Sequence, residues 1–201
     1  MMISLLLLAA APETATMPRL GKPVGNIARW FSESDWSAGR NGGAARFKTV
    51  FAKDGTPERC MIEESTGNAR VDELACRRAM ERFRFEPSID SDGQPARRVF
   101  VRRVSFGPDM SDKVRPLPAY MIDLPIKGKP QLLDVTVDVD AAGSLRGCAS
   151  PANDKRLAPF GAAICQALAA SWRPAIETDA ANQPLRYVRD LNILIRPAPA
   201  P

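Results

Sequence analysis

Four cysteines and no histidine limit the side-chain chemistry open to this 201-residue chain. Cys60, Cys76, Cys148 and Cys165 could bind zinc as thiolates, form a redox pair or close two disulfides. Zinc and redox sites usually contain two cysteines separated by two residues, whereas the spacings here are 16, 72 and 17. The absence of histidine excludes Ser-His-Asp and Cys-His nucleophiles, histidine acid–base catalysis and zinc sites with imidazole ligands.

Paired carboxylates also fail to form a convincing catalytic pattern. Glu63 and Glu64 are adjacent on an expected strand, so their side chains point to opposite faces. Asp90 and Asp92 flank an expected turn. We therefore expect no catalytic residue, no metal site and no cofactor, and we predict that the chain is not an enzyme.

An internal repeat is the strongest pattern in the sequence. In each copy a β-rich run meets a glycine turn, and a cysteine follows that glycine by five positions, Gly55 before Cys60 and Gly143 before Cys148. A second cysteine follows after 16 or 17 residues inside a helical pattern. A Gln-Pro pair then opens another β-rich run in both copies. The shared order of these features predicts two copies of one unit.

Each copy is expected to form a strand, a second strand, a helix and a third strand. In the first copy the strands cover residues 47–51, 57–65 and 97–106, and Asn68 or Asp72 caps the helix. Because apolar and polar residues alternate along the strands, each sheet has one solvated face and one face covered by the helix. The predicted fold class is α+β, with two tandem ββαβ units that each contain a small antiparallel sheet and one helix packed on one face.

The second copy shows the clearest alternation of apolar and polar residues. Between residues 133 and 139, apolar side chains alternate with Asp134, Thr136 and Asp138. Asp138 and Asp140 share the polar face, where two carboxylates are too few for a calcium site. We expect these carboxylates to solubilise an exposed sheet face.

The cysteines of each unit link its second strand to its helix. Because these elements are neighbours in the expected unit, Cys60–Cys76 and Cys148–Cys165 disulfides are geometrically reasonable. Closing a loop of about 15 residues contributes about 3 kcal/mol, a large share of the stability of a domain of about 60 residues. The alternative, four buried free thiols, would place the chain in a reducing compartment.

The first residues and the prolines divide the chain. Residues 2–11 form an apolar run that ends in three alanines, too short to span a bilayer and typical of a secretory signal peptide. We assign residues 1–17 to this signal, against the alternative of an apolar segment buried in the fold. Units at 18–106 and 132–201 then flank a linker at 107–131, which contains five prolines.

The charge pattern gives no support for a nucleic-acid partner. The net charge is only +5, and few aromatic residues interleave with the arginines. Most of the arginines concentrate in the first unit, where acidic residues between them indicate a solvated face, although a weak association with membrane or peptidoglycan stays open. Trp30 and Trp36 are expected to pack against the sheet rather than stack on a ligand.

A series of short motifs carries a family likeness. They are Asp54-Gly55, Ser65-Thr66-Gly67, Val71-Asp72, Arg84-Phe85-Glu86-Pro87 and Gly93-Gln94-Pro95. Their order resembles the carboxy-terminal domain of TonB-type energy transducers. The likeness covers about residues 28–106 and is fainter over about 117–196, where Ala142-Gly143 replaces the Asp-Gly pair.

The resemblance implies a sheet that recognises an extended peptide, the TonB box of an outer-membrane receptor, by adding it as a strand. No spanning anchor or long proline-rich arm is expected before the first unit. We therefore expect an exported, periplasmic tandem of TonB-like modules associated with TonB-dependent transport, with tethering through an uncleaved N-terminus as an alternative. Its partner would be an outer-membrane receptor or another envelope protein.

The expected peptide-binding edge lies on the third strand of the first unit, at Val99, Val101, Arg103 and Ser105. Residues 185–195 of the second unit are the other candidate. In the alternative function, the chain is a structural envelope protein whose units pair with each other or with a second copy as a homodimer. A structure in which both third strands are already paired within the chain would overturn the expectation of peptide binding.

Overall fold

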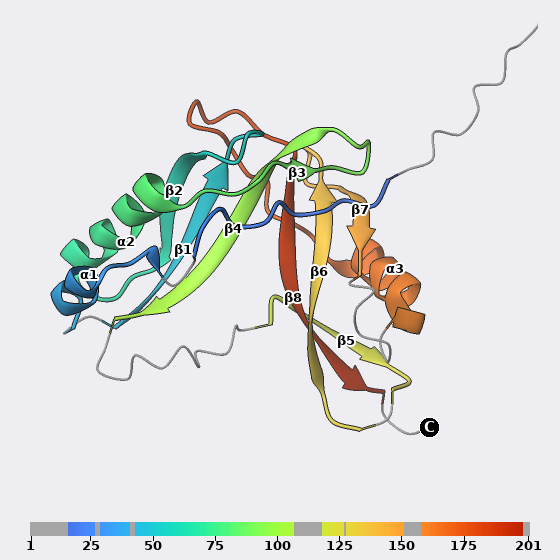
Figure 1. Ribbon diagram of the computed structural model, residues 1–201. Coiled ribbons are helices and arrows are strands. Elements are labelled where there is room, and N and C mark those ends of the chain that lie inside the picture. Colours follow the sequence, from blue (N-terminus) through green and yellow to red (C-terminus); the bar gives the residue numbers. More distant parts are fainter. Residues whose placement is uncertain are drawn as a thin grey trace, which may run out of the picture.

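In the part of the chain that the structure describes, eight strands and three α-helices form an α+β fold built on one mixed sheet (Figure 1). The structure is a computed structural model and describes residues 16–26, 29–40, 43–106, 118–126, 128–150 and 158–198. Most of the predicted signal segment and residues 107–117 of the predicted linker lie outside these ranges. We call the described residues up to 106 the first half and those from 118 onward the second half.

The first half contains two helices and four strands. Its elements are α1 (Glu33–Ala38), β1 (Ala44–Phe51), β2 (Pro57–Glu64), α2 (Ala69–Arg82), β3 (Ser88–Ile89) and β4 (Pro95–Ser105). β1 pairs antiparallel with β2 on one side and with β4 on the other. Gly55 makes the β1–β2 turn with a φ of +84°, and a Cβ at this position would lie 1.8 Å from the Phe85 carbonyl oxygen. This turn therefore requires glycine.

Asn68, rather than Asp72, is the N-cap of α2. Its side chain accepts a hydrogen bond from the Arg70 amide. Asp72 instead accepts hydrogen bonds from the Thr66 amide and the Ser65 hydroxyl. Asp72 thus stabilises the turn that leads into the helix instead of capping it. The helix α2 buries its apolar side against the sheet.

The second half contains five longer elements and one short helical turn. They are β5 (Tyr120–Leu124), β6 (Gln131–Val139), β7 (Leu145–Ala149), the 3-10 helix η2 (Ala158–Phe160), α3 (Gly161–Ser171) and β8 (Tyr187–Pro197). β6 pairs antiparallel with both β7 and β8. Its partners match those of β1 in the first half, which also lies between two antiparallel strands.

The two halves share one sheet with the strand order β2-β1-β4-β8-β6-β7. β4 and β8 join in parallel where Arg97 pairs with Tyr187 and Arg98 pairs with Val188. The prediction of a separate antiparallel sheet in each unit missed this joint. Each third strand is the open edge of its own three strands, so pairing the two edges satisfies backbone groups of both.

The helices α2 and α3 cover opposite faces of the sheet. Paired residues on neighbouring strands point to the same face, so Val188 shares a face with Arg98, which lies against Phe85 on the α2 side. Tyr187, the residue before Val188, points to the other face and belongs to the core that contains Ile164 of α3. The two helices lie at opposite ends of the sheet in Figure 1.

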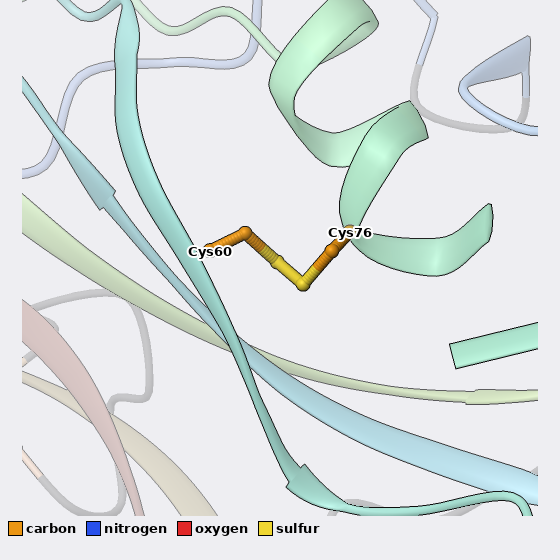
Figure 2. The surroundings of a disulfide bond; sticks show 2 residues. All are labelled: Cys60 and Cys76. Carbon is orange, nitrogen blue, oxygen red and sulfur yellow. A yellow bond between two sulfur atoms is a disulfide. The ribbon is translucent and has the colours of Figure 1, made fainter. Parts of the chain in front are cut away.

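Both predicted disulfides are present. Cys60 of β2 is joined to Cys76 of α2, with their Cα atoms 5.5 Å apart (Figure 2). Cys148 of β7 is joined to Cys165 of α3, with a Cα separation of 5.7 Å. Each bond therefore attaches a helix to an outermost strand of the sheet.

The two cores differ in composition. The first is aromatic: Trp30 stacks on Phe83 with ring centroids 3.9 Å apart and is 4% exposed. This packing confirms the structural role expected for Trp30. The second core is mainly aliphatic and includes Val50 and Val99 from the first half. The halves therefore bury apolar surface against each other as well as sharing the sheet.

Candidate functional site

The predicted edge of the first half lies on β4 beyond the joint with β8. Residues 95–96 of β4 pair with β3, and residues 97–98 pair with β8. From residue 99 to residue 105, β4 pairs with β1 on one side. On the other side of these seven residues, no strand pairs with β4 among the described parts of the chain. A strand side without a neighbouring strand can offer backbone donors and acceptors to an added strand.

The four predicted edge residues share one face of β4 but differ in accessibility. Val99 is fully buried in the core shared by the two halves, and Val101 packs partly against that core. Arg103 is exposed and Ser105 is half-buried. Contact with an added strand through side chains is therefore open to Arg103, Ser105 and part of Val101, while Val99 anchors β4 to the second half.

The other predicted edge, on β8, is occupied by other parts of the chain except at residues 189–191. Residues 187–188 of β8 pair with β4, and β5 adds in parallel along residues 193–197. The Ala119 amide also donates a hydrogen bond to the Asn192 carbonyl at 2.7 Å. The chain thus supplies its own added strand at the third strand of its second half.

Side chains as well as backbone hold β5 in place. Ile122 and Leu124 are buried in the second core. Asp123 forms a bidentate ion pair with Arg196 of β8, at 2.8 and 3.0 Å. β5 falls within the predicted proline-rich linker, which was expected to be extended. The alternating Tyr120, Ile122 and Leu124 were the signal in the sequence that could have revealed an edge strand there.

A buried ionic cluster locks the two halves together on one side of the sheet. Asp138 of β6 is fully buried, which corrects the prediction that it faces solvent. Arg186 donates from Nε to its Oδ1 at 3.0 Å, and the Ser91 hydroxyl donates to its Oδ2 at 2.6 Å. Burial alone would raise the pKa of Asp138, but these hydrogen bonds outweigh it and hold the pKa below its usual value.

A second lock lies on the opposite face of the sheet. Lys48 of β1 forms an ion pair with Glu177 at 2.8 Å, and Glu177 is 3% exposed. Arg59 of β2 donates to the Thr178 hydroxyl at 2.8 Å. The segment before β8 therefore packs on the first half, just as the segment that contains Ser91 packs on the second half.

Two arginines of α2 contact a buried carboxylate of α1 rather than lying only on the predicted solvated face. Arg78 and Arg82 both bond to Asp35 of α1, which is 3% exposed. Burial would raise the pKa of Asp35, but hydrogen bonds from Ser32 and Arg78 lower it overall. These arginines attach α1 to α2.

The burial of Arg98 on β4, which is 6% exposed, was not predicted from the sequence.

Comparison with known proteins adds no relative. No family model, curated protein or solved structure matches the chain. Within the described ranges, no helix is long and apolar enough to cross a membrane. The same residues contain no cluster of cysteine and carboxylate side chains that could hold a metal ion. The geometry of the third strands is thus the feature from which a function can be argued.

Proposed function

We propose that the chain is a periplasmic protein-interaction module of the TonB carboxy-terminal type. In this proposal, an extended segment of an outer-membrane receptor, like a TonB box, binds as an added strand along residues 99–105 of β4. The observation that carries it is the unequal pairing of β4, which has β1 on one side and no described strand on the other. The module would act in TonB-dependent transport.

Three features support this proposal. The order of β1, β2, α2 and β4 agrees with the ββαβ unit that the sequence motifs indicate, and β6, β7, α3 and β8 repeat that order. The two disulfides fit an oxidising compartment such as the periplasm. The chain also binds its own β5 by strand addition, so this sheet accepts a parallel strand at an edge.

The chemistry of the edge predicts what its partner carries. Backbone hydrogen bonds supply affinity in strand addition, and alternate side chains supply specificity. Arg103 is the exposed charged residue among the four predicted contacts. We therefore expect the partner segment to be extended, free of proline at the paired positions, and acidic opposite Arg103.

Site-directed crosslinking tests the proposal. A photoreactive amino acid replaces Arg103 in the full chain, which is then mixed with envelope extract and irradiated. Matched variants carry the same group at Met121, which is 53% exposed on β5, and at Glu73 on α2. Adducts with an outer-membrane receptor are expected from position 103 alone. Equal adducts from all three positions, or none from position 103, would contradict the proposal.

The joint between β4 and β8 favours a second candidate function. Because the third strands pair with each other and β5 covers β8, the chain can instead be a structural envelope protein with no receptor partner. In that case β4 would pair with a second copy, and the group at position 103 would crosslink two copies of this chain. The mass of the adduct therefore distinguishes the two functions.

A further inference from the structure

A second extended segment of the chain is bound by strand addition. Residues 16–24, here called the strap, run antiparallel to residues 84–91 of the first half. The Arg19 amide donates to the Ile89 carbonyl and the Ile89 amide donates back, both at 2.9 Å. The Glu86 amide donates to the Lys22 carbonyl and the Val24 amide to the Arg84 carbonyl, both at 2.8 Å. The strap is thus held chiefly through its backbone.

Gly21 sets the register of the strap. A Cβ built on Gly21 would lie 1.7 Å from the Glu86 carbonyl oxygen, so a larger residue cannot occupy this position without moving the backbone. The Gly21 amide donates to the Ser88 hydroxyl at 3.0 Å in a buried contact. Close backbone approach of this kind is the main reason for a required glycine in an extended segment.

A buried arginine points at the strap. Arg98 is 6% exposed, and its guanidinium carbon lies 3.8 Å from the centroid of the Phe85 ring. Its Nη1 donates to the Gly21 carbonyl at 2.8 Å, while its Nε has no hydrogen-bond partner among the described residues. Burial lowers the pKa of Arg98 to about 10. A buried cation with so few acceptors is stabilised by a peptide carbonyl at this position.

The other end of the strap contacts the second half. Pro18 is buried, and its Cδ lies 3.4 Å from the position that a Cβ on Gly147 of β7 would take. Thr16 donates from its amide to the Ser91 carbonyl at 2.9 Å, and Ser91 also bonds to Asp138. The strap therefore reaches from the first half to the joint between the halves.

Most of the remaining side chains of the strap are exposed to solvent. Met17 is 75% exposed and Val24 is 54% exposed, and Arg19 and Lys22 are also exposed. Their identities contribute little to the fit, because exposed side chains leave the backbone contacts unchanged. The two buried positions, Pro18 and Gly21, are three residues apart.

From these contacts we infer that residues 84–91 and Arg98 form a second peptide-binding site, specific for an extended Pro-x-x-Gly segment, which the chain fills with its own strap. The site is separate from the β4 edge and does not depend on the proposed receptor binding. A tethered strap acts at an effective concentration of roughly a millimolar, so a free peptide reaches the site mainly when the strap is displaced.

Displacing the strap within the full chain tests this inference. The Gly21→Val variant should release the strap, and Lys22→Val is the matched control because Lys22 is exposed. A labelled peptide that copies residues 14–26 should bind Gly21→Val about tenfold or more tightly than it binds the control. The same peptide with valine at the position of Gly21 should not bind either variant.

The results that overturn the inference are equally defined. Equal binding of the glycine and valine peptides would contradict the proposed specificity for glycine. Failure of a folded Gly21→Val variant to bind the glycine peptide would contradict the existence of the site. Circular dichroism and intact disulfides establish that the variant is folded.

A measurement on the otherwise unchanged chain covers the case in which Gly21→Val does not fold. A photoreactive group at position 19, an exposed strap residue after the predicted signal, should crosslink near Ile89, and several millimolar glycine peptide should suppress this crosslink while the valine peptide does not. A crosslink to Ile89 of a second copy would support the site with the strap supplied in trans. A crosslink that neither peptide suppresses would contradict the inference.

Discussion

The third strands of the two halves hold equivalent places in the sheet and have different neighbours. β8 is flanked by β6 on one side, and by β4 and β5 on the other. β4 is flanked by β1 along residues 98–105, but residues 99–105 have no described strand on the other side. Among the described residues, the third strand of the second half therefore has neighbours on both sides over most of its length, whereas residues 99–105 of the first half's third strand have a neighbour on one side.

The difference suggests that the two halves have different roles. The second half closes its own edge with β5, and its aliphatic core receives Val50 and Val99 from the first half. The second half thereby packs against β4, and because β5 pairs with β8, this half does not bind the same partner segment. The first half, with its aromatic core, carries the edge that we propose for recognition.

Removing the centre of the aromatic core should have the largest effect. Phe83 is fully buried and its ring contacts those of Trp30, Phe31, Phe47 and Phe100. Phe83→Ala should lower the free energy of unfolding by about 3–5 kcal/mol, and Leu168→Ala in the second core by about 2–5 kcal/mol. Urea unfolding measures both effects.

Because the halves share the second core, each of these substitutions should lower the unfolding free energy of both halves. Trp172 lies against the second core and reports on that half. In a chain whose Trp30 and Trp36 are replaced by phenylalanine, so that Trp172 is the sole tryptophan, Phe83→Ala should shift the fluorescence transition to lower urea than in the same chain with Phe83 intact. An unchanged Trp172 transition would show that the halves unfold independently and would contradict their coupling through the shared core.

The disulfides should contribute almost equally. Their sequence separations are 16 and 17, so the entropy removed from the unfolded chain is nearly the same. Replacing Cys60 and Cys76 with alanine should cost about 3 kcal/mol, and replacing Cys148 and Cys165 should cost about the same. Guanidinium unfolding compares the two pairs. A difference larger than about 2 kcal/mol would show that the halves rely on their disulfides unequally.

The ionic joint should have a smaller effect that depends on pH. Asp138→Asn should cost about 1.5–3 kcal/mol at neutral pH, because Arg186 and Ser91 lose a charged acceptor. The pKa of Asp138 is lowered in the folded state, so its contribution is complete above the ordinary aspartate pKa of about 3.9 and is lost as pH falls through the lower folded value.

Stability measured from neutral pH to acid tests the sign of this dependence. The unfolding free energy of the wild type should fall more steeply on acidification than that of Asp138→Asn. Asp134→Asn, on an exposed residue of the same strand face, should behave like the wild type. Parallel acid profiles for the wild type and Asp138→Asn would mean that Asp138 does not stabilise the joint through its charge.

The smallest effect on stability is expected at the open edge. Arg103 is exposed, so Arg103→Glu should change the unfolding free energy by no more than about 0.5 kcal/mol while weakening capture of the receptor. Arg196→Glu, on the closed edge of β8, should leave capture unchanged although it breaks the ion pair with Asp123. Equal loss of capture in both variants would remove the distinction between the edges.

Local patterns in the sequence predict the elements better than their assembly. Apolar alternation and the cysteine spacing predict the α+β class and both disulfides, because these depend on neighbouring elements. The burial of Asp138 was not predicted, because its partner Ser91 is 47 residues away and belongs to the other half. The polar alternation that marks a solvated face is the same whether that face meets water or another part of the chain.

The open and closed edges differ in predictability for the same reason. The position of β4 follows from its own sequence, whereas its joint with β8 depends on two edges meeting over a separation of 90 residues. The strap and β5 were missed because each is a short extended segment near prolines, without the longer alternation typical of a strand. Both are held mainly by partners far along the chain.

Amide hydrogen exchange of the free chain tests the central contrast most directly. Along residues 99–105 of β4, alternate amides point away from β1 and should exchange much faster than their neighbours. The amides of β8 that face β4 and β5 should be protected to a similar degree as those that face β6. Uniformly slow exchange along residues 99–105 would show that the β4 edge is closed and would contradict the account.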